Sequence, residues 1–251
     1  MDTSDLSILI PAFIAGVLVL ATHVPLGMKV LARGIIFADL AVAQIAGLGV
    51  VIAGLAGLGE HPIAVQLIAA GSALLGAALL AYIEHFLTEV REACIGLLFV
   101  LAASGSVLLM SSDPHAGEHL KDLLVGQILW VSNHQLVATA LLSAAILLLW
   151  YRFRHHLSSF GFYALFALAV TASVQLVGVY LVFASLIVPA LATHRLHRLR
   201  MPTAYAIGLR GYAGGLLLSI WLDLPAGAAI VWTMAVIGAT GLLWSLRGGR
   251  A

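Results

Sequence analysis

The chain has 251 residues, of which 62% are hydrophobic and only 9% are Asp, Glu, Lys or Arg, against roughly 25% charged residues in soluble domains. A mean hydropathy of +1.09 and repeated apolar runs of about 20 residues predict an all-α, polytopic membrane protein and argue against nucleic acid as a partner. The net charge of +1 says little, and the single cysteine excludes an intramolecular disulfide and a thiolate metal cluster.

The first apolar run is expected to be a retained helix. Cleaved signal peptides begin with positive charge, whereas Asp2 and Asp5 precede this run.

Nine apolar spans are separated by short polar or Pro/Gly breaks and predict a single transmembrane domain over residues 1–251, with eight to nine helices. They lie near 6–28, 34–58, 62–83, 93–112, 123–151, 159–179, 180–194, 203–222 and 226–246. The run 123–151 is too long for one straight span, and 180–194 is short. We therefore expect a re-entrant or half helix around 123–133 and a broken hairpin around Gly178 and Pro189.

Basic residues occupy every second connection between these spans. They are Lys29, Arg33, Arg91, Arg152, Arg154, Arg195, Arg198, Arg200, Arg247 and Arg250. Acidic residues mark the other connections, at Asp2, Asp5, Glu60, Asp113, Glu118 and Asp223. The positive-inside bias then predicts an amino terminus outside and a carboxyl terminus in the cytoplasm.

No enzymatic motif stands out. Neither of the two lysines lies in a phosphate-binding loop, and no HExxH pattern occurs. Any ATP must be hydrolysed by another chain.

Asp39 lies about five residues inside the second span, roughly 7 Å from its cytoplasmic end. A charge at membrane depth costs roughly 2.5–3.5 kcal/mol and therefore usually marks a pathway or a pair. His23 in the first span is expected at a similar level. Together the two side chains could bind a divalent transition metal transiently. The alternative is a buried hydrogen bond between them that only fixes helix packing.

The outer loop "DPHAGEHLKD" at 113–122 places His115 and His119 four residues apart, with Asp122 three further on. If this stretch is helical, the three side chains share one face. They could receive a metal from an extracytoplasmic carrier, or form only a solvated polar loop.

Two stretches carry a resemblance: "HVPLGMKVLARGIIFADLAVAQIAGLGV" at 23–50 and "VGVYLVFASLIVPALATHRL" at 177–196, with weaker matches at 92–105, 123–132 and 223–232. The sequence resembles the membrane subunits of bacterial ABC importers for zinc and manganese. The resemblance implies a homodimeric permease in the inner membrane, surrounded by lipid. Its partners would be a separate ABC ATPase subunit and an extracytoplasmic metal-binding protein, and its metal would be cargo, not a bound cofactor.

The chain departs from that family pattern at two places. The family carries a histidine four residues after the second-span Asp, where this chain has Ala43. The nearest polar residue, Gln44, points about 140° away from Asp39 unless the helix bulges, so His23 is our candidate for the missing imidazole.

The second departure lies between Arg152 and Phe160. The family has a short cytoplasmic helix there that docks on the ATPase, and this chain runs almost directly into the next span. Loss of that segment leaves an alternative function, a non-transporting membrane scaffold or sensor.

Overall fold

The computed structural model describes residues 3–111, 124–153, 156–196 and 198–248, and every regular element in these ranges is helical. The elements are α1 (Thr3–Arg33), α2 (Ala38–Leu55), α3 (Pro62–Phe86), η1 (Thr88–Val90), α4 (Arg91–Leu109), η2 (Ile128–Trp130), α6 (Asn133–Phe153), α7 (Ser159–Val177), α8 (Val179–Ala192), α9 (Arg200–Leu222) and α10 (Ala226–Gly248). Seven helices within the described ranges are long and apolar enough to cross a membrane. The predicted polytopic helical membrane protein is confirmed.

The long apolar run 123–151 folds into two parts in its described residues. Gly126 turns the chain with φ +72°, η2 follows as one 3-10 turn, and α6 begins only at Asn133. Ser132 and Gln135 explain that start: the Ser132 N–H donates to Gln135 Oε1 (2.9 Å) and the Gln135 N–H to Ser132 Oγ (3.3 Å), as in a capping box. Within the described residues, 124 and 125 are α-helical and η2 follows Gly126, so the expected re-entrant or half helix around 123–133 stays a prediction.

The predicted break at Gly178 is confirmed. Gly178 has φ +81°, ends α7 and begins α8. Its backbone packs against the backbone of Val125 and Gly126 so closely that a Cβ on either glycine would meet main-chain atoms. Pro189 does not interrupt α8, which continues to Ala192.

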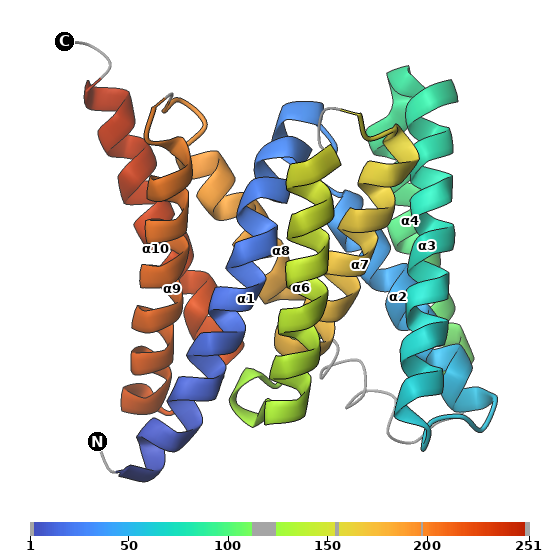
Figure 1. Ribbon diagram of the computed structural model, residues 1–251, viewed down its shortest axis with the longest axis horizontal. Helices are drawn as coiled ribbons and strands as arrows, with labels where there is room; N and C mark the ends of the chain where they lie inside the picture. The colour runs from blue at the N-terminus through green and yellow to red at the C-terminus, as the bar shows by residue number, and fades with distance from the viewer. Residues whose placement is uncertain (1–2, 112–123, 154–155, 197, 249–251) are drawn as a thin grey trace.

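The helices form a bundle in which α9 and α10 lie at one end, α1, α6 and α8 in the middle, and α7, α2, α3 and α4 toward the other end (Figure 1). The main helix pairs include α2 with α3 and α4, α3 with α7, α1 with α8, and α9 with α10. Helix α7 is the most buried of the seven candidate spans.

The two termini lie on opposite faces of the bundle (Figure 1). We call them the N-terminal face, where α1 begins, and the C-terminal face, where α10 ends. The α1–α2, α3–α4, α6–α7 and α8–α9 connections reach the C-terminal face, and the α2–α3 and α9–α10 connections reach the N-terminal face. The connections rich in arginine thus share one face, in agreement with the alternation in the sequence.

Candidate functional site

A polar turn of α1 holds His23, which is fully buried (0% exposed). Its Nδ1 lies 2.9 Å from the carbonyl oxygen of Val19 and 3.0 Å from Thr22 Oγ1. Because a carbonyl oxygen can only accept, Nδ1 carries a proton, and in the neutral ring the lone pair is then on Nε2. Nε2 is buried without a hydrogen-bond partner among the described residues. A backbone carbonyl on one ring nitrogen is the arrangement that prepares the other nitrogen to bind a metal.

Asp39 is also buried (1% exposed) and lies in the first turn of α2. Its Oδ1 accepts a hydrogen bond from the Leu40 N–H at 2.8 Å. A carboxylate in a first turn is stabilised by the amino-terminal end of the helix dipole. Local backbone groups therefore offset part of the cost of burying this side chain.

The structure does not bring His23 and Asp39 into direct contact in this conformation. They form no ion pair within 4.0 Å. Among the described side chains, the ion pair is the one between Arg33 and Glu84. The described part of the chain also holds no group of three His, Cys, Asp or Glu side chains that could bind a metal. The predicted metal site at these two residues stays a prediction.

Gln44 and Ala43 occupy the positions expected from a regular helix. Helix α2 is α-helical from Ala38 to Leu55 without a bulge, so Gln44 stays about 140° around the helix from Asp39. Ala43, one turn from Asp39 on the same side, is buried.

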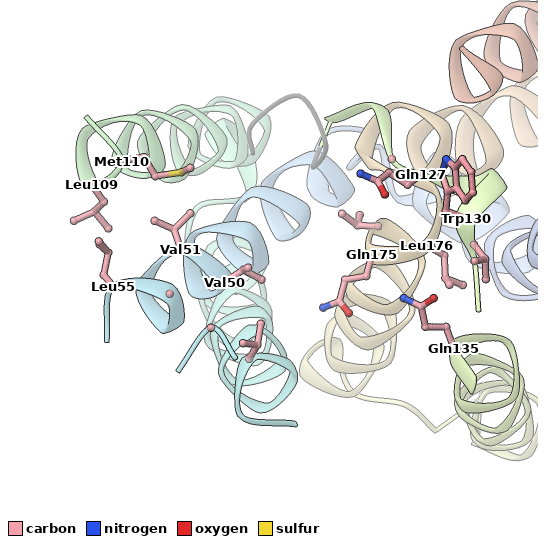
Figure 2. Close-up of a pocket in the computed structure, with 16 residues that line it drawn as sticks. Val50, Val51, Leu55, Leu109, Met110, Gln127, Trp130, Gln135, Gln175 and Leu176 are labelled. Carbon is pink, nitrogen blue, oxygen red and sulfur yellow. The ribbon is translucent and has the colours of Figure 1, made fainter. Parts of the chain in front are cut away.

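A cavity of about 760 Å³ opens beside α2 and α7 (Figure 2). Val50 and Leu55 of α2 and Met110 form part of its apolar wall, and three glutamines, Gln127, Gln135 and Gln175, line the opposite side. Because Gln135 Oε1 accepts from Ser132 N and Oγ, its amide nitrogen is left to face the cavity. Small-ligand sites combine apolar walls with a few polar groups in this way.

Helix α8 is shorter than the thickness of a bilayer core. Fourteen residues span about 21 Å, less than the roughly 30 Å of a bilayer core. Because α8 ends at the C-terminal face, its start at Gly178 lies inside the bundle, set back from the N-terminal face. Gly126, Val174 and Gln175, which lie close to this start in the sequence or in space, are among the residues that line the cavity.

The predicted outer cluster of His115, His119 and Asp122 lies outside the described residues. Met110, which precedes this loop in the sequence, and Gly126, which follows it, both line the cavity.

A charged cluster at the C-terminal face was not predicted from the sequence. Arg33 lies 3.4 Å from Glu84 and stacks 4.2 Å from the centroid of the Phe162 ring. Glu92 Oε1 accepts from the Ile36 N–H at 2.8 Å. Arg33, Glu84 and Glu92 thus connect the ends of α3 and α4 to the turn between α1 and α2. The two glutamates that flank the α3–α4 connection are visible in the sequence. Their partners lie more than 50 residues away, so the sequence does not show which residues they contact.

Membrane-spanning helices, buried polar side chains and a recess open to one face together define a membrane transport protein. The chain belongs to the ABC 3 transport family, whose model matches residues 5–162 and 155–244. This confirms the resemblance carried by residues 23–50 and 177–196. The two matched stretches overlap at 155–162, the junction of α6 and α7.

The fold is also similar to that of a solved structure described as PsaBC from Streptococcus pneumoniae in complex with Fab. The TM-score is 0.73 at 23% sequence identity, over 93% of this chain and 89% of the other. A search of curated proteins found no match.

Proposed function

We propose that this chain is the permease subunit of an ABC-type importer for a divalent metal, zinc or manganese, in which a separate subunit hydrolyses ATP. The observation that carries the proposal is the family match, which extends over almost the whole chain. The buried polar turn at His23, the buried Asp39 and the cavity at one face support a path for a polar cargo.

The proposed orientation places the C-terminal face in the cytoplasm of a bacterial cell and the N-terminal face outside. The support is the arginines in the connections of the C-terminal face. The cavity would then open to the outside, where an extracytoplasmic metal-binding protein delivers the ion. We further propose a homodimer of this chain in the inner membrane, joined to the ABC ATPase subunit.

Metal would first reach His115, His119 and Asp122, since Met110 and Gly126, on either side of them in the sequence, line the cavity. It would then step to Asp39 and His23. Such a step requires a second conformation that brings the carboxylate and His23 Nε2 together. Alternating access supplies two conformations of this kind. Gln44 could take part only if α2 unwinds locally.

The test is to purify the chain together with an ABC ATPase subunit of the same organism, reconstitute the complex in vesicles, and measure ATP hydrolysis with zinc or manganese. Metal-dependent stimulation together with metal accumulation supports the proposal. Vesicles without ATP and vesicles with magnesium as the added metal are the controls. Failure of the ATPase to co-purify would instead favour the scaffold or sensor.

A further inference from the structure

The cavity beside α2 and α7 is larger than a hydrated metal ion requires. Its volume is about 760 Å³, whereas a divalent ion with about six waters fills roughly 180 Å³, at about 30 Å³ per water. Pockets of about 300–1,000 Å³ are typical of sites for small organic molecules. Gly54 on the α2 wall keeps this space open, because a Cβ there would have no atom within 4 Å. The cavity therefore has room for a metal together with an organic ligand.

One side of the cavity presents hydrogen-bond donors. Gln135 Oε1 is occupied by the N–H and hydroxyl of Ser132, so the amide nitrogen of Gln135 points into the cavity, toward Gln175 (Figure 2). The indole of Trp130, which donates and cannot accept, lines the same side in the turn that begins at Gln127. Such donors bind the carboxylate oxygens of an organic acid, and they do not coordinate a cation.

The opposite wall of the cavity is apolar. It is formed by Val50, Val51 and Leu55 of α2 with Leu109 and Met110 (Figure 2), and the described residues that line the cavity are all uncharged. Bringing a bare dication against apolar walls costs free energy. A neutral complex avoids most of this cost, because anionic ligands cancel the charge of the metal and present carbon atoms to the wall. Donors on one side and apolar side chains on the other thus match a metal complex of an organic acid.

We propose that the cavity binds the cargo metal as a neutral complex with small organic acids, such as two amino-acid anions, and not as the hydrated ion. The carboxylate oxygens of the complex accept from the Gln135 amide and the Trp130 indole, and its carbon atoms pack on the α2 wall. The organic ligands keep the metal coordinated while it occupies the cavity. This inference rests on the proposed function, which supplies the metal as cargo, and it names the chemical form in which that cargo arrives.

The size of the cargo is tested with zinc and radiolabelled histidine, because two histidine monoanions on one zinc ion give a neutral complex. Binding of the label to the reconstituted permease–ATPase complex, measured without ATP, should require zinc. Gly54→Phe places a ring in the cavity and should weaken this binding about tenfold. Gly71→Phe is the matched control, since Gly71 of α3 is exposed, lies outside the cavity lining and also has no atom within 4 Å of an added Cβ. No zinc-dependent binding of the label, or equal binding by the parent and Gly54→Phe, overturns the inference.

The charge of the cargo is tested with Gln135→Glu. This change keeps the acceptor for Ser132 but replaces the donor nitrogen with a charged oxygen, so it should weaken binding of the zinc–histidine complex about tenfold. Trp130→Phe removes the other donor and should act in the same direction. A cavity for the hydrated ion would instead bind zinc more tightly in Gln135→Glu, and that result overturns the inference.

The parent complex separates this inference from the proposed function. If it neither accumulates zinc nor hydrolyses ATP in response to zinc, with or without histidine, the proposed function fails. If it accumulates zinc supplied alone while the Gly54 and Gln135 variants bind the zinc–histidine complex as the parent does, only this inference fails.

Discussion

The hydroxyl of Tyr205 on α9 donates a hydrogen bond to the carbonyl oxygen of Ala21 on α1, at 3.2 Å. Pro25 lies four residues after Ala21 within the same helix and has no N–H to donate to that carbonyl. The tyrosine thus satisfies a backbone group that the proline leaves free, as neighbouring helices do in membranes. Seven residues later on α9, the Tyr212 hydroxyl lies 2.9 Å from Ser185 Oγ, one turn before Pro189 of α8. Helix α9 therefore supports α1 and α8 next to their prolines.

Tyr205→Phe should lower the free energy of unfolding by about 0.6–1.5 kcal/mol, the range for hydrogen bonds between membrane helices. In a Pro25→Ala background the loss should be smaller, because the introduced alanine would supply a backbone N–H to the Ala21 carbonyl. The measurement is a double-mutant cycle of unfolding in lipid–detergent mixtures. An equal loss in both backgrounds would show that Tyr205 does not compensate for Pro25.

Gly126→Ala and Gly178→Ala should each destabilise the protein by about 2 kcal/mol or more. The added Cβ is strained at a positive φ and also collides with backbone atoms, and the two costs add. A Cβ on Gly126 would meet the backbone of Val177 and Gly178. Gly71→Ala in α3 is the matched control, since nothing lies within 4 Å of its added Cβ. Thermal unfolding of the purified variants is the measurement. If Gly126→Ala and Gly71→Ala unfold alike, the close contact of the two turns contributes no stability.

Asp39→Asn should leave the fold intact and abolish metal transport. The amide is isosteric and avoids burying a charge, but it is a poor ligand for a divalent cation. His23→Ala should cause a similar loss, and the double variant should be little worse, because residues that act as one unit are not additive.

Metal uptake into vesicles measures all three variants. Gln44→Ala is the comparison within α2: normal transport means that α2 stays regular, and lost transport means that it unwinds during the cycle. If the Asp39→Asn variant transports metal normally and is more stable than the parent, Asp39 serves only helix packing.

The double substitution His115→Ala and His119→Ala should reduce uptake mainly at low external metal. A receiving cluster raises capture of the ion and leaves the translocation step unchanged. Initial uptake rates across a range of zinc or manganese concentrations give this comparison. Uptake rates equal to those of the parent at every concentration would mean that the two histidines only belong to a solvated polar loop.

Reporter fusions at residues 60, 115 and 223 should behave as extracytoplasmic, and fusions at 88 and 198 as cytoplasmic. The reason is the excess of arginine on the C-terminal face. A cytoplasmic reporter at 60 or 223 would reverse the orientation and place the cavity on the inner side.

Local chemistry made several features predictable from the sequence. Nine apolar spans specified an all-helical membrane protein because lipid requires each backbone group to be paired within its own segment. The sequence places arginines in every second connection, and the structure places these connections on one face. The two agree because each membrane crossing brings the chain to the opposite face. Gly178 marked the break between α7 and α8, because glycine alone adopts its φ without strain.

Tertiary contacts decided the rest. Gly126 meets Gly178 across 52 residues, and Glu92 reaches the Ile36 N–H across 56, separations at which sequence periodicity carries no information. The cavity is built where separate segments meet, and three glutamines reach it from three of them. The sequence by itself determined which segments enter the membrane, through hydropathy and charge. Only the packing of those segments decided which polar groups lie together, because burial and distance arise when distant helices pack side by side.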